Sequence, residues 1–420
     1  SNLPLANKKV NVLGWGSTNP VYGGTGSGSM SDQYDTVSLL DGMKEAGIET
    51  NADLTKLYTD YRADRPVVGM WAQDWTLPEV PADQYSDSLI SDAKSFSDEA
   101  VVVLTRVGGE GADLPMNMKA EGITYENNSK DYEDFKDGES FLQLSQTERD
   151  MLDLVTNTFQ FDFLNDYPQI KSVVWCPPAG QTGFSALGDV LAGDTNPSGK
   201  TSDTFLKDLT QSVSYNNFGK FEYTNMEDKA AKYTGFTGDE VTAIPGFVNY
   251  SEGIYVGYKF YETAAAEGAI DYDSMVAFPF GYGLSYTTFE QKLNDVTYKD
   301  GKVTVDVTVT NTGDTAGKDV VEVYYNPPYT EGGIEKASAN LVGFEKTEKL
   351  EPGASEDVTV EFEDDDMASY DYKNAKAYVL EKGDYNISIN SDSHTVIGSK
   401  KITVDDTITY DSDSNTHNGD

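Results

Sequence analysis

The hydrophobic pattern of this chain changes its period near residue 290, and that change limits the folds that the chain can adopt. Before this point, short β-branched runs alternate with helical patterns, which is typical of a parallel sheet covered by helices. After it, Val303, Val305, Val307 and Val309 alternate with threonine and aspartate, as in a half-buried antiparallel strand. The sequence therefore predicts an α/β region followed by a smaller all-β region, in line with the two or three domains expected for 420 residues.

The α/β region covers residues 1–289 and contains three apolar runs that are predicted to be buried strands, at 10–13, 100–104 and 172–175. A helix is expected at 37–46, closed by Gly47, and another after Ser145, which forms a capping-box sequence with Glu148. This alternation predicts a mostly parallel sheet sandwiched by helices.

The all-β region covers residues 290–404, where turn signals separate predicted strands at 320–325, 358–362 and 385–389. This spacing is typical of an immunoglobulin-like sandwich. Residues 405–420 hold five aspartates and no lysine or arginine, so an acidic tail or linker is predicted there.

Charge and composition exclude several classes of partner. The chain has 31 basic and 71 acidic residues, and the resulting net charge of −40 argues against nucleic acid and anionic lipid as partners. The single cysteine and two histidines form no cluster for zinc or haem, so neither a metal nor a cofactor is predicted. No apolar run approaches the ~18–20 residues that span a bilayer, so this segment should not insert into a membrane. The compartment stays open between the cytoplasm and the bacterial cell surface.

Six segments rich in glycine and aromatic residues follow one another over nearly three hundred residues. In order they are GGTGSG (23–28), GGEGAD (108–113), WCPPAGQTG (175–183), GDTNPSGK (193–200), YSEGIYVGY (250–258) and FPFGYGLSYTTF (278–289). Together they resemble glycoside hydrolase family 3, the family of β-glucosidases, β-xylosidases and related exo-acting enzymes. The later segments 320–324 and 341–344 resemble the fibronectin type III-like domain that accompanies this family.

The resemblance implies an enzyme in which a TIM-like barrel supplies an aspartate nucleophile and an α/β sandwich supplies the acid/base. This chain resembles the sandwich plus the fibronectin-like domain, so we expect the barrel after residue 420 or before residue 1. Asp74 stands in a look-alike of the nucleophile motif, but no series of eight strand–helix units surrounds it, and a structural role is predicted instead. The family also has another strand between the helix after Ser145 and residue 172, and this strand is expected to be missing here.

The predicted acid/base is Glu110, which follows the strand at 100–104 and lies between two glycines. Ligand sites of α/β sheets gather beyond the carboxyl ends of the strands, and flanking glycines let a loop pass close to a sugar. Partial burial and a nearby nucleophile charge are expected to keep this carboxyl protonated until it acts.

Three further residues are predicted to bind substrate. Asp113 should orient the Glu110 loop or contact sugar hydroxyls, with a turn-forming role equally expected. Tyr22, beside the 23–28 loop, should belong to the aglycone side. Glu252 is the second choice for the acid, although the aromatic spacing after it favours the start of a core-facing helix.

The predicted function is therefore part of a retaining exo-acting β-glycosidase that acts on a small-molecule or oligosaccharide substrate and is inactive without its barrel domain. The alternative is a non-catalytic carbohydrate-binding or scaffolding module. A dinucleotide site at the 23–28 loop is disfavoured, because the glycines lie well downstream of the first strand and no acidic residue follows a second strand at the required place.

Overall fold

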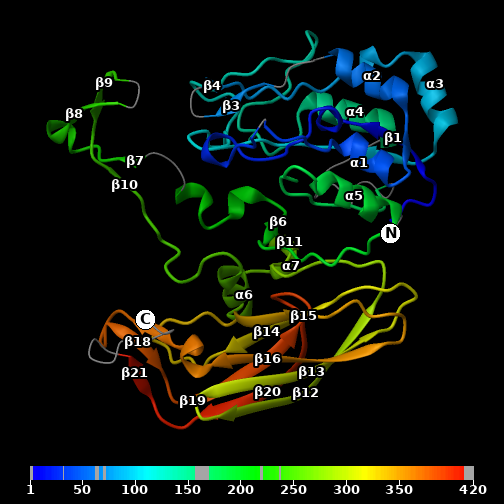
Figure 1. The fold of residues 1–420 in the computed structure, drawn as a ribbon. Coiled ribbons are helices and arrows are strands. Elements are labelled where there is room, and N and C mark those ends of the chain that lie inside the picture. Colours follow the sequence, from blue (N-terminus) through cyan, green and yellow to red (C-terminus); the bar gives the residue numbers. More distant parts are fainter. Residues whose placement is uncertain are drawn as a thin grey trace. The chain divides into compact units, whose positions relative to one another are not determined.

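The computed structural model describes residues 3–31, 33–61, 66–69, 72–156, 170–217, 221–235 and 238–410. The chain forms two compact units, Ser1–Asn196 (unit 1) and Pro197–Asp420 (unit 2), whose elements are labelled in Figure 1. Unit 1 holds a parallel sheet with helices and unit 2 holds the later all-β region, so the predicted fold class is confirmed. Within these ranges no helix combines the length and the apolar character needed to cross a membrane.

Unit 1 holds a parallel sheet with the strand order β2 (Glu49–Thr50), β1 (Lys9–Leu13) and β5 (Ala100–Val102), and a separate antiparallel pair of β3 (Val68–Gly69) and β4 (Ala72–Gln73). Because strand side chains alternate, Val10 and Val12 pack with α1 and α5 on one face, whereas Leu13 packs with α2 on the other. The elements are β1 (Lys9–Leu13), α1 (Leu39–Glu45), β2 (Glu49–Thr50), α2 (Ala52–Tyr61), β3 (Val68–Gly69), β4 (Ala72–Gln73), α3 (Asp87–Phe96), β5 (Ala100–Val102), α4 (Gln146–Thr156) and α5 (Gly183–Ala192).

The two helices predicted from local signals begin close to the expected residues, and α1 also ends close to its expected end. The Ser38 side chain caps α1 by accepting from the Asp41 N–H, and Gly47 follows the helix with φ of 76°. At α4 the capping box is complete, because the Ser145 N–H donates to Glu148 Oε2 at 2.9 Å and the Glu148 N–H donates to Ser145 Oγ at 3.1 Å.

The predicted strand at 172–175 is wrong. Residues 170–179 contain no strand, and the side chains of Val173, Val174 and Trp175 are 44%, 44% and 56% exposed. β-branched composition is a weak predictor of a strand, because the preference depends on burial and packing, and these side chains are not buried. The strand that we expected to be missing falls on 157–169, outside the described residues.

Unit 2 begins with short elements that pair in twos. Strand β7 pairs with β10, β8 with β9, and β6 with β11, all antiparallel. Their bounds, with the two helices of this part, are β6 (Phe205–Leu206), β7 (Phe221–Glu222), β8 (Ala231–Thr234), β9 (Glu240–Ala243), β10 (Gly246–Phe247), α6 (Tyr258–Ala266), α7 (Tyr272–Met275) and β11 (Val276–Phe278).

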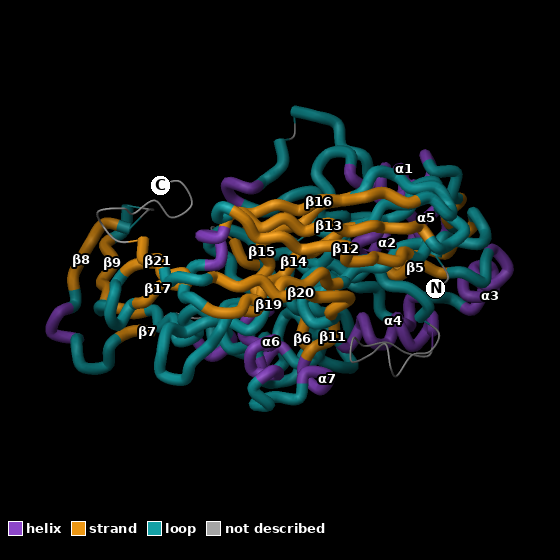
Figure 2. Tube along the Cα trace, turned by 90° about the horizontal axis from the view of Figure 1, so that it is seen from below, coloured by secondary structure: helices purple, strands orange, loops and turns teal. Residues whose placement is uncertain are grey.

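The rest of unit 2 is a β-sandwich. Strands β12, β13 and β16 lie side by side in one sheet (Figure 2), and a second sheet has the order β15-β14-β19-β20. A third small sheet has the order β17-β18-β21. The bounds are β12 (Phe289–Lys299), β13 (Lys302–Asn311), β14 (Val320–Asn326), β15 (Asn340–Lys346), β16 (Ser355–Glu363), β17 (Ser369–Asp371), β18 (Ala377–Leu380), β19 (Gly383–Asn390), β20 (Val396–Val404) and β21 (Ile408–Tyr410).

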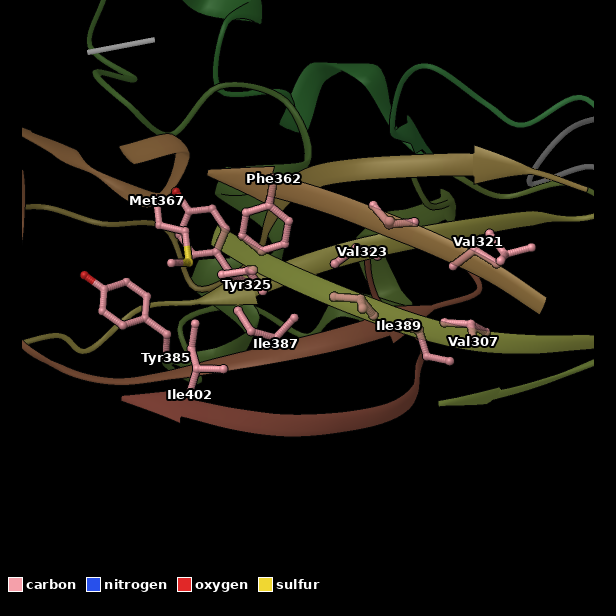
Figure 3. Close-up of a cluster of buried hydrophobic side chains, with 14 of the residues drawn as sticks. Val307, Val321, Val323, Tyr325, Phe362, Met367, Tyr385, Ile387, Ile389 and Ile402 are labelled. Atoms are coloured by element: carbon pink, nitrogen blue, oxygen red, sulfur yellow. The ribbon is translucent and has the colours of Figure 1, made fainter. Parts of the chain in front are cut away.

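The core of this sandwich is built by the alternating residues that the sequence singled out. Val303, Val305, Val307 and Val309 are all completely buried. They meet side chains from β14, β16 and β19, among them Tyr325 (Figure 3). The remaining residues on the opposite side of β13 are threonine, aspartate and lysine and are half-buried, as a one-sided antiparallel strand requires.

The division at residues 289 and 290 coincides with the start of β12, whereas the two compact units meet at residues 196 and 197. The predicted domain bounds stay a prediction. The acidic tail predicted at 405–420 is wrong for residues 408–410, because they form β21 and pair with β18. The end of that tail, 411–420, lies outside the described residues.

Candidate functional site

Glu110 lies at the tip of a tight turn that follows β5. The turn is closed by two backbone hydrogen bonds between Gly109 and Ala112, of 3.3 and 2.9 Å, and Gly111 adopts a φ of 69° that a side chain disfavours. Glu110 itself is exposed. The turn therefore presents the carboxylate beyond the carboxyl end of a strand of the parallel sheet.

The 23–28 loop lies directly against this turn. The Ser27 N–H donates a 2.9 Å hydrogen bond to Glu110 Oε2. The loop approaches so closely that a Cβ atom at Gly109 would stand 1.4 Å from Thr25 Oγ1. Two segments that are over eighty residues apart in sequence thus form one surface around the Glu110 carboxylate.

A third segment supports the turn from the β3–β4 hairpin. Gln73 Nε2 donates to the carbonyl of Gly111 at 2.7 Å. The neighbouring Asp74, rejected above as a nucleophile, instead closes a local turn, because its Oδ1 accepts from the N–H and the hydroxyl of Thr76.

Arg106 anchors the start of the Glu110 loop. Its Nη1 and Nη2 donate to the two carboxylate oxygens of Glu148 at 2.7 Å each, and Glu148 is fully buried. The other guanidinium hydrogen bonds reach the carbonyls of Thr105, Phe141 and Gln143 at 3.0, 2.6 and 2.7 Å. Such a two-pronged pair fixes direction as well as distance, so it ties the loop to the start of α4.

The electrostatics of Glu110 differ from what we expected. The Ser27 N–H, and after it the Ser27 side chain, hold the pKa of Glu110 below its usual value, because both stabilise the charged form. The expected partial burial is wrong for unit 1, where Glu110 is exposed. For Glu110 to be protonated at neutral pH, other groups would have to cover the turn and raise its pKa.

The other predicted site residues are placed as follows. Asp113 is exposed on the same loop as Glu110. Tyr22 is half-buried and its ring packs edge-on against Phe184, with centroids 5.7 Å apart, at the border of the α1–α5 core. Glu252 belongs to unit 2, where it is half-buried in the turn before α6.

Four contributors escaped the sequence reasoning: Ser27, Gln73, Arg106 and Glu148. Ser27 lies in the 23–28 segment, which was predicted to lie on the aglycone side, and Glu148 carried a capping-box signal that indicated a helix start rather than a partner for Arg106. Among the residues that the structure describes, no group of three or more histidines, cysteines and acidic residues could hold a metal ion.

Comparisons with known proteins identify the family of this chain. The family model described as the glycosyl hydrolase family 3 C-terminal domain matches residues 1–258, and the fibronectin type III-like domain model matches residues 319–393. A β-glucosidase of Ruminococcus albus is 32% identical over 418 residues, which cover 96% of this chain and 39% of that protein. An exo-α-(1→6)-L-arabinopyranosidase of Bifidobacterium breve is 28% identical and matches 94% of this chain and 44% of its own length.

A solved structure also resembles nearly the whole of this chain. The structure of β-glucosidase 3B from Thermotoga neapolitana in complex with α-D-glucose superimposes with a TM-score of 0.72 and 28% identity, over 98% of this chain and 52% of that one. The chain therefore spans about two fifths to one half of the length of these relatives.

Proposed function

The chain belongs to glycoside hydrolase family 3, and we propose that it carries the general acid/base half of a retaining, exo-acting β-glycosidase of the β-glucosidase or β-xylosidase type. Its substrate is a terminal β-linked sugar of a small glycoside or an oligosaccharide. The nucleophile belongs to a barrel domain outside these 420 residues.

The observation that carries the proposal is the exposed Glu110 at the tip of its turn. The turn is held by Ser27, Gln73 and Arg106, so the carboxylate has a defined place while one side stays open to solvent. Retaining hydrolysis needs two carboxyl groups about 5–5.5 Å apart on either side of the scissile bond. An exposed carboxylate on a rigid turn suits a partner carboxylate that arrives from another domain.

In the first step the nucleophile attacks the anomeric carbon, the glycosidic C–O bond breaks, and Glu110 gives its proton to the leaving oxygen. In the second step Glu110 takes a proton from water, and the oxygen of that water attacks the anomeric carbon and releases the nucleophile. The first step requires protonated Glu110, whereas the Ser27 hydrogen bond favours the ionised form. Burial under the barrel and the charge of its nucleophile are the two effects that raise the pKa of Glu110 in the assembled enzyme.

The strongly acidic chain fits a neutral substrate. A net charge of −40 repels anionic ligands, whereas an uncharged glycoside approaches without an electrostatic barrier. The sugar is proposed by analogy alone: relatives named for β-glucosidase and arabinopyranosidase activity both match most of this chain.

The test compares the isolated chain with the full-length protein that contains a barrel. We expect the isolated chain to show negligible hydrolysis of aryl β-glucosides and β-xylosides. In the full-length protein, Glu110→Gln should lower kcat by about 10²–10⁴-fold, and azide should partly restore the rate of Glu110→Ala. The exposed Glu121→Gln serves as the matched control and should keep the parent rate.

A full-length Glu110→Gln enzyme with parental kcat would remove Glu110 from the reaction. Calorimetry separates the alternative function, because tight binding of glucosides or xylo-oligosaccharides by the isolated chain would favour a non-catalytic carbohydrate-binding module.

A further inference from the structure

The contact between the 23–28 loop and the Glu110 turn is built on glycines from both sides. Gly26 has a φ of 74°, and a Cβ atom there would lie 2.7 Å from both Cβ and Oε2 of Glu110. Across the contact, a Cβ atom at Gly109 would overlap Thr25 Oγ1 at 1.4 Å and approach Thr25 Cβ at 2.7 Å. Real Cβ atoms do not come this close, so any side chain at either glycine forces the two segments apart.

The close approach of the 23–28 loop to the Glu110 turn allows a hydrogen bond between them. It brings the Ser27 N–H within 2.9 Å of Glu110 Oε2. A backbone N–H has no side-chain freedom to lose and donates in one direction, so this hydrogen bond fixes the carboxylate as well as stabilising its charge.

We propose that residues 25–27 form a clamp for the acid/base, in which Ser27 is a positioning residue that holds Glu110 in its base form and releases it when the carboxyl takes up a proton. This inference rests on the proposed function and deepens it. It assigns to the glycine-rich segment a role in proton transfer instead of contact with the aglycone.

Among the described residues around the carboxylate, the charges leave this role to Ser27, whose backbone N–H contributes most and whose side chain contributes next. The loop segment from Tyr22 to Gly28 contains no charged residue. The β3–β4 hairpin contributes the neutral Gln73, and its Asp74 is engaged by Thr76. On the Glu110 loop itself, Arg106 is committed to Glu148 and to backbone carbonyls, and the acidic Asp113 is exposed to solvent.

The clamp has a consequence for the two steps of the reaction. It favours the carboxylate that deprotonates water in the second step, and it opposes the protonated form that the first step needs. Loosening the clamp should therefore raise the pKa of Glu110, since a hydrogen bond to the charged form is lost. In the full-length enzyme the alkaline limb of kcat/KM reports this acid and should move to higher pH in the same variants.

The decisive experiment titrates Glu110 by NMR in the 420-residue chain, which does not depend on catalysis. Gly26→Ala places a methyl group against the carboxylate, and Ser27→Pro deletes the donor N–H together with the Ser27 hydroxyl. The matched control is Gly28→Ala, where an added Cβ meets nothing within 4 Å. Unchanged tryptophan fluorescence confirms that each variant keeps the fold of unit 1.

We expect an upward shift of the Glu110 pKa in Gly26→Ala and Ser27→Pro and none in Gly28→Ala. The Ser27 amide should also exchange with solvent roughly tenfold faster in Gly26→Ala, because a hydrogen bond to a charged group is lost. A Glu110 pKa that stays at the parental value in both variants would overturn the clamp. A shifted pKa together with a fully active Glu110→Gln enzyme would keep the clamp and refute the proposed function.

Discussion

Replacing Arg106 with methionine, which is also unbranched but is shorter and uncharged, should destabilise unit 1 by about 3–5 kcal/mol. Methionine keeps the aliphatic part of the side chain but loses the guanidinium, whose carbon lies 5.6 Å from the centroid of the Phe141 ring. What it cannot do is neutralise Glu148, whose side chain is 0% exposed. Removal of one partner from a buried pair leaves an uncompensated charge, which typically costs about 3–5 kcal/mol.

Two comparisons separate this effect from an ordinary surface contact. The pair of Lys56 with Asp60 has side chains that are 72% and 61% exposed, so Lys56→Met should cost only about 0.3–0.5 kcal/mol. The double variant Arg106→Met/Glu148→Gln should recover part of the loss, because the glutamine carries no charge and can still accept from the Ser145 N–H.

The measurement is urea unfolding followed by tryptophan fluorescence. All four tryptophans of the chain lie within residues 1–196, so the signal reports unit 1 without a contribution from unit 2. Trp15 and Trp75 are 4% and 1% exposed and should respond strongly to unfolding. If Arg106→Met cost no more than Lys56→Met, the argument that this ion pair anchors the Glu110 loop would be refuted.

Three further outcomes are expected. Gly188→Ala should destabilise unit 1 by about 1–3 kcal/mol in the same assay, because its Cβ would stand 2.2 Å from the Gly42 carbonyl oxygen where α1 and α5 cross. Burial raises the pKa of Glu79 to about 8, so unit 1 should lose stability as the pH rises from about 4.5 to 8, and Glu79→Gln should flatten that dependence. Burial likewise raises the pKa of Glu322 to about 7, so the protection of the β14 amides, corrected for the pH dependence of intrinsic exchange, should fall between about pH 4.5 and 7, and less in Glu322→Gln. A parental pH slope in either glutamine variant would contradict the assignment.

The elements that could be predicted share one property: their signals are local. Ser145 and Glu148 are three residues apart and satisfy each other's backbone N–H groups, so the start of α4 follows from a short stretch of sequence. The stripe from Val303 to Val309 repeats every second residue, and this period alone places one face of β13 in a core.

The errors have the opposite property. The run at 172–175 has the composition of a buried strand, but it contains no strand, and Val173, Val174 and Trp175 are exposed. Glu110 was predicted to be partly buried, whereas within unit 1 it is exposed. Its surroundings depend on Ser27, which is 83 residues away along the chain.

The sequence by itself determined the fold class, the family and the position of the Glu110 turn. The signals for them, which are the hydrophobic period, the helix caps and the glycine-rich segments, each lie within a short stretch of contiguous residues. Only the tertiary structure decided that the turn is clamped by Ser27, supported by Gln73 and anchored through Arg106 on Glu148. The physical reason is that hydrogen bonds and ion pairs act over about 3 Å in space, and no pattern along the chain records which distant residues folding brings within that distance.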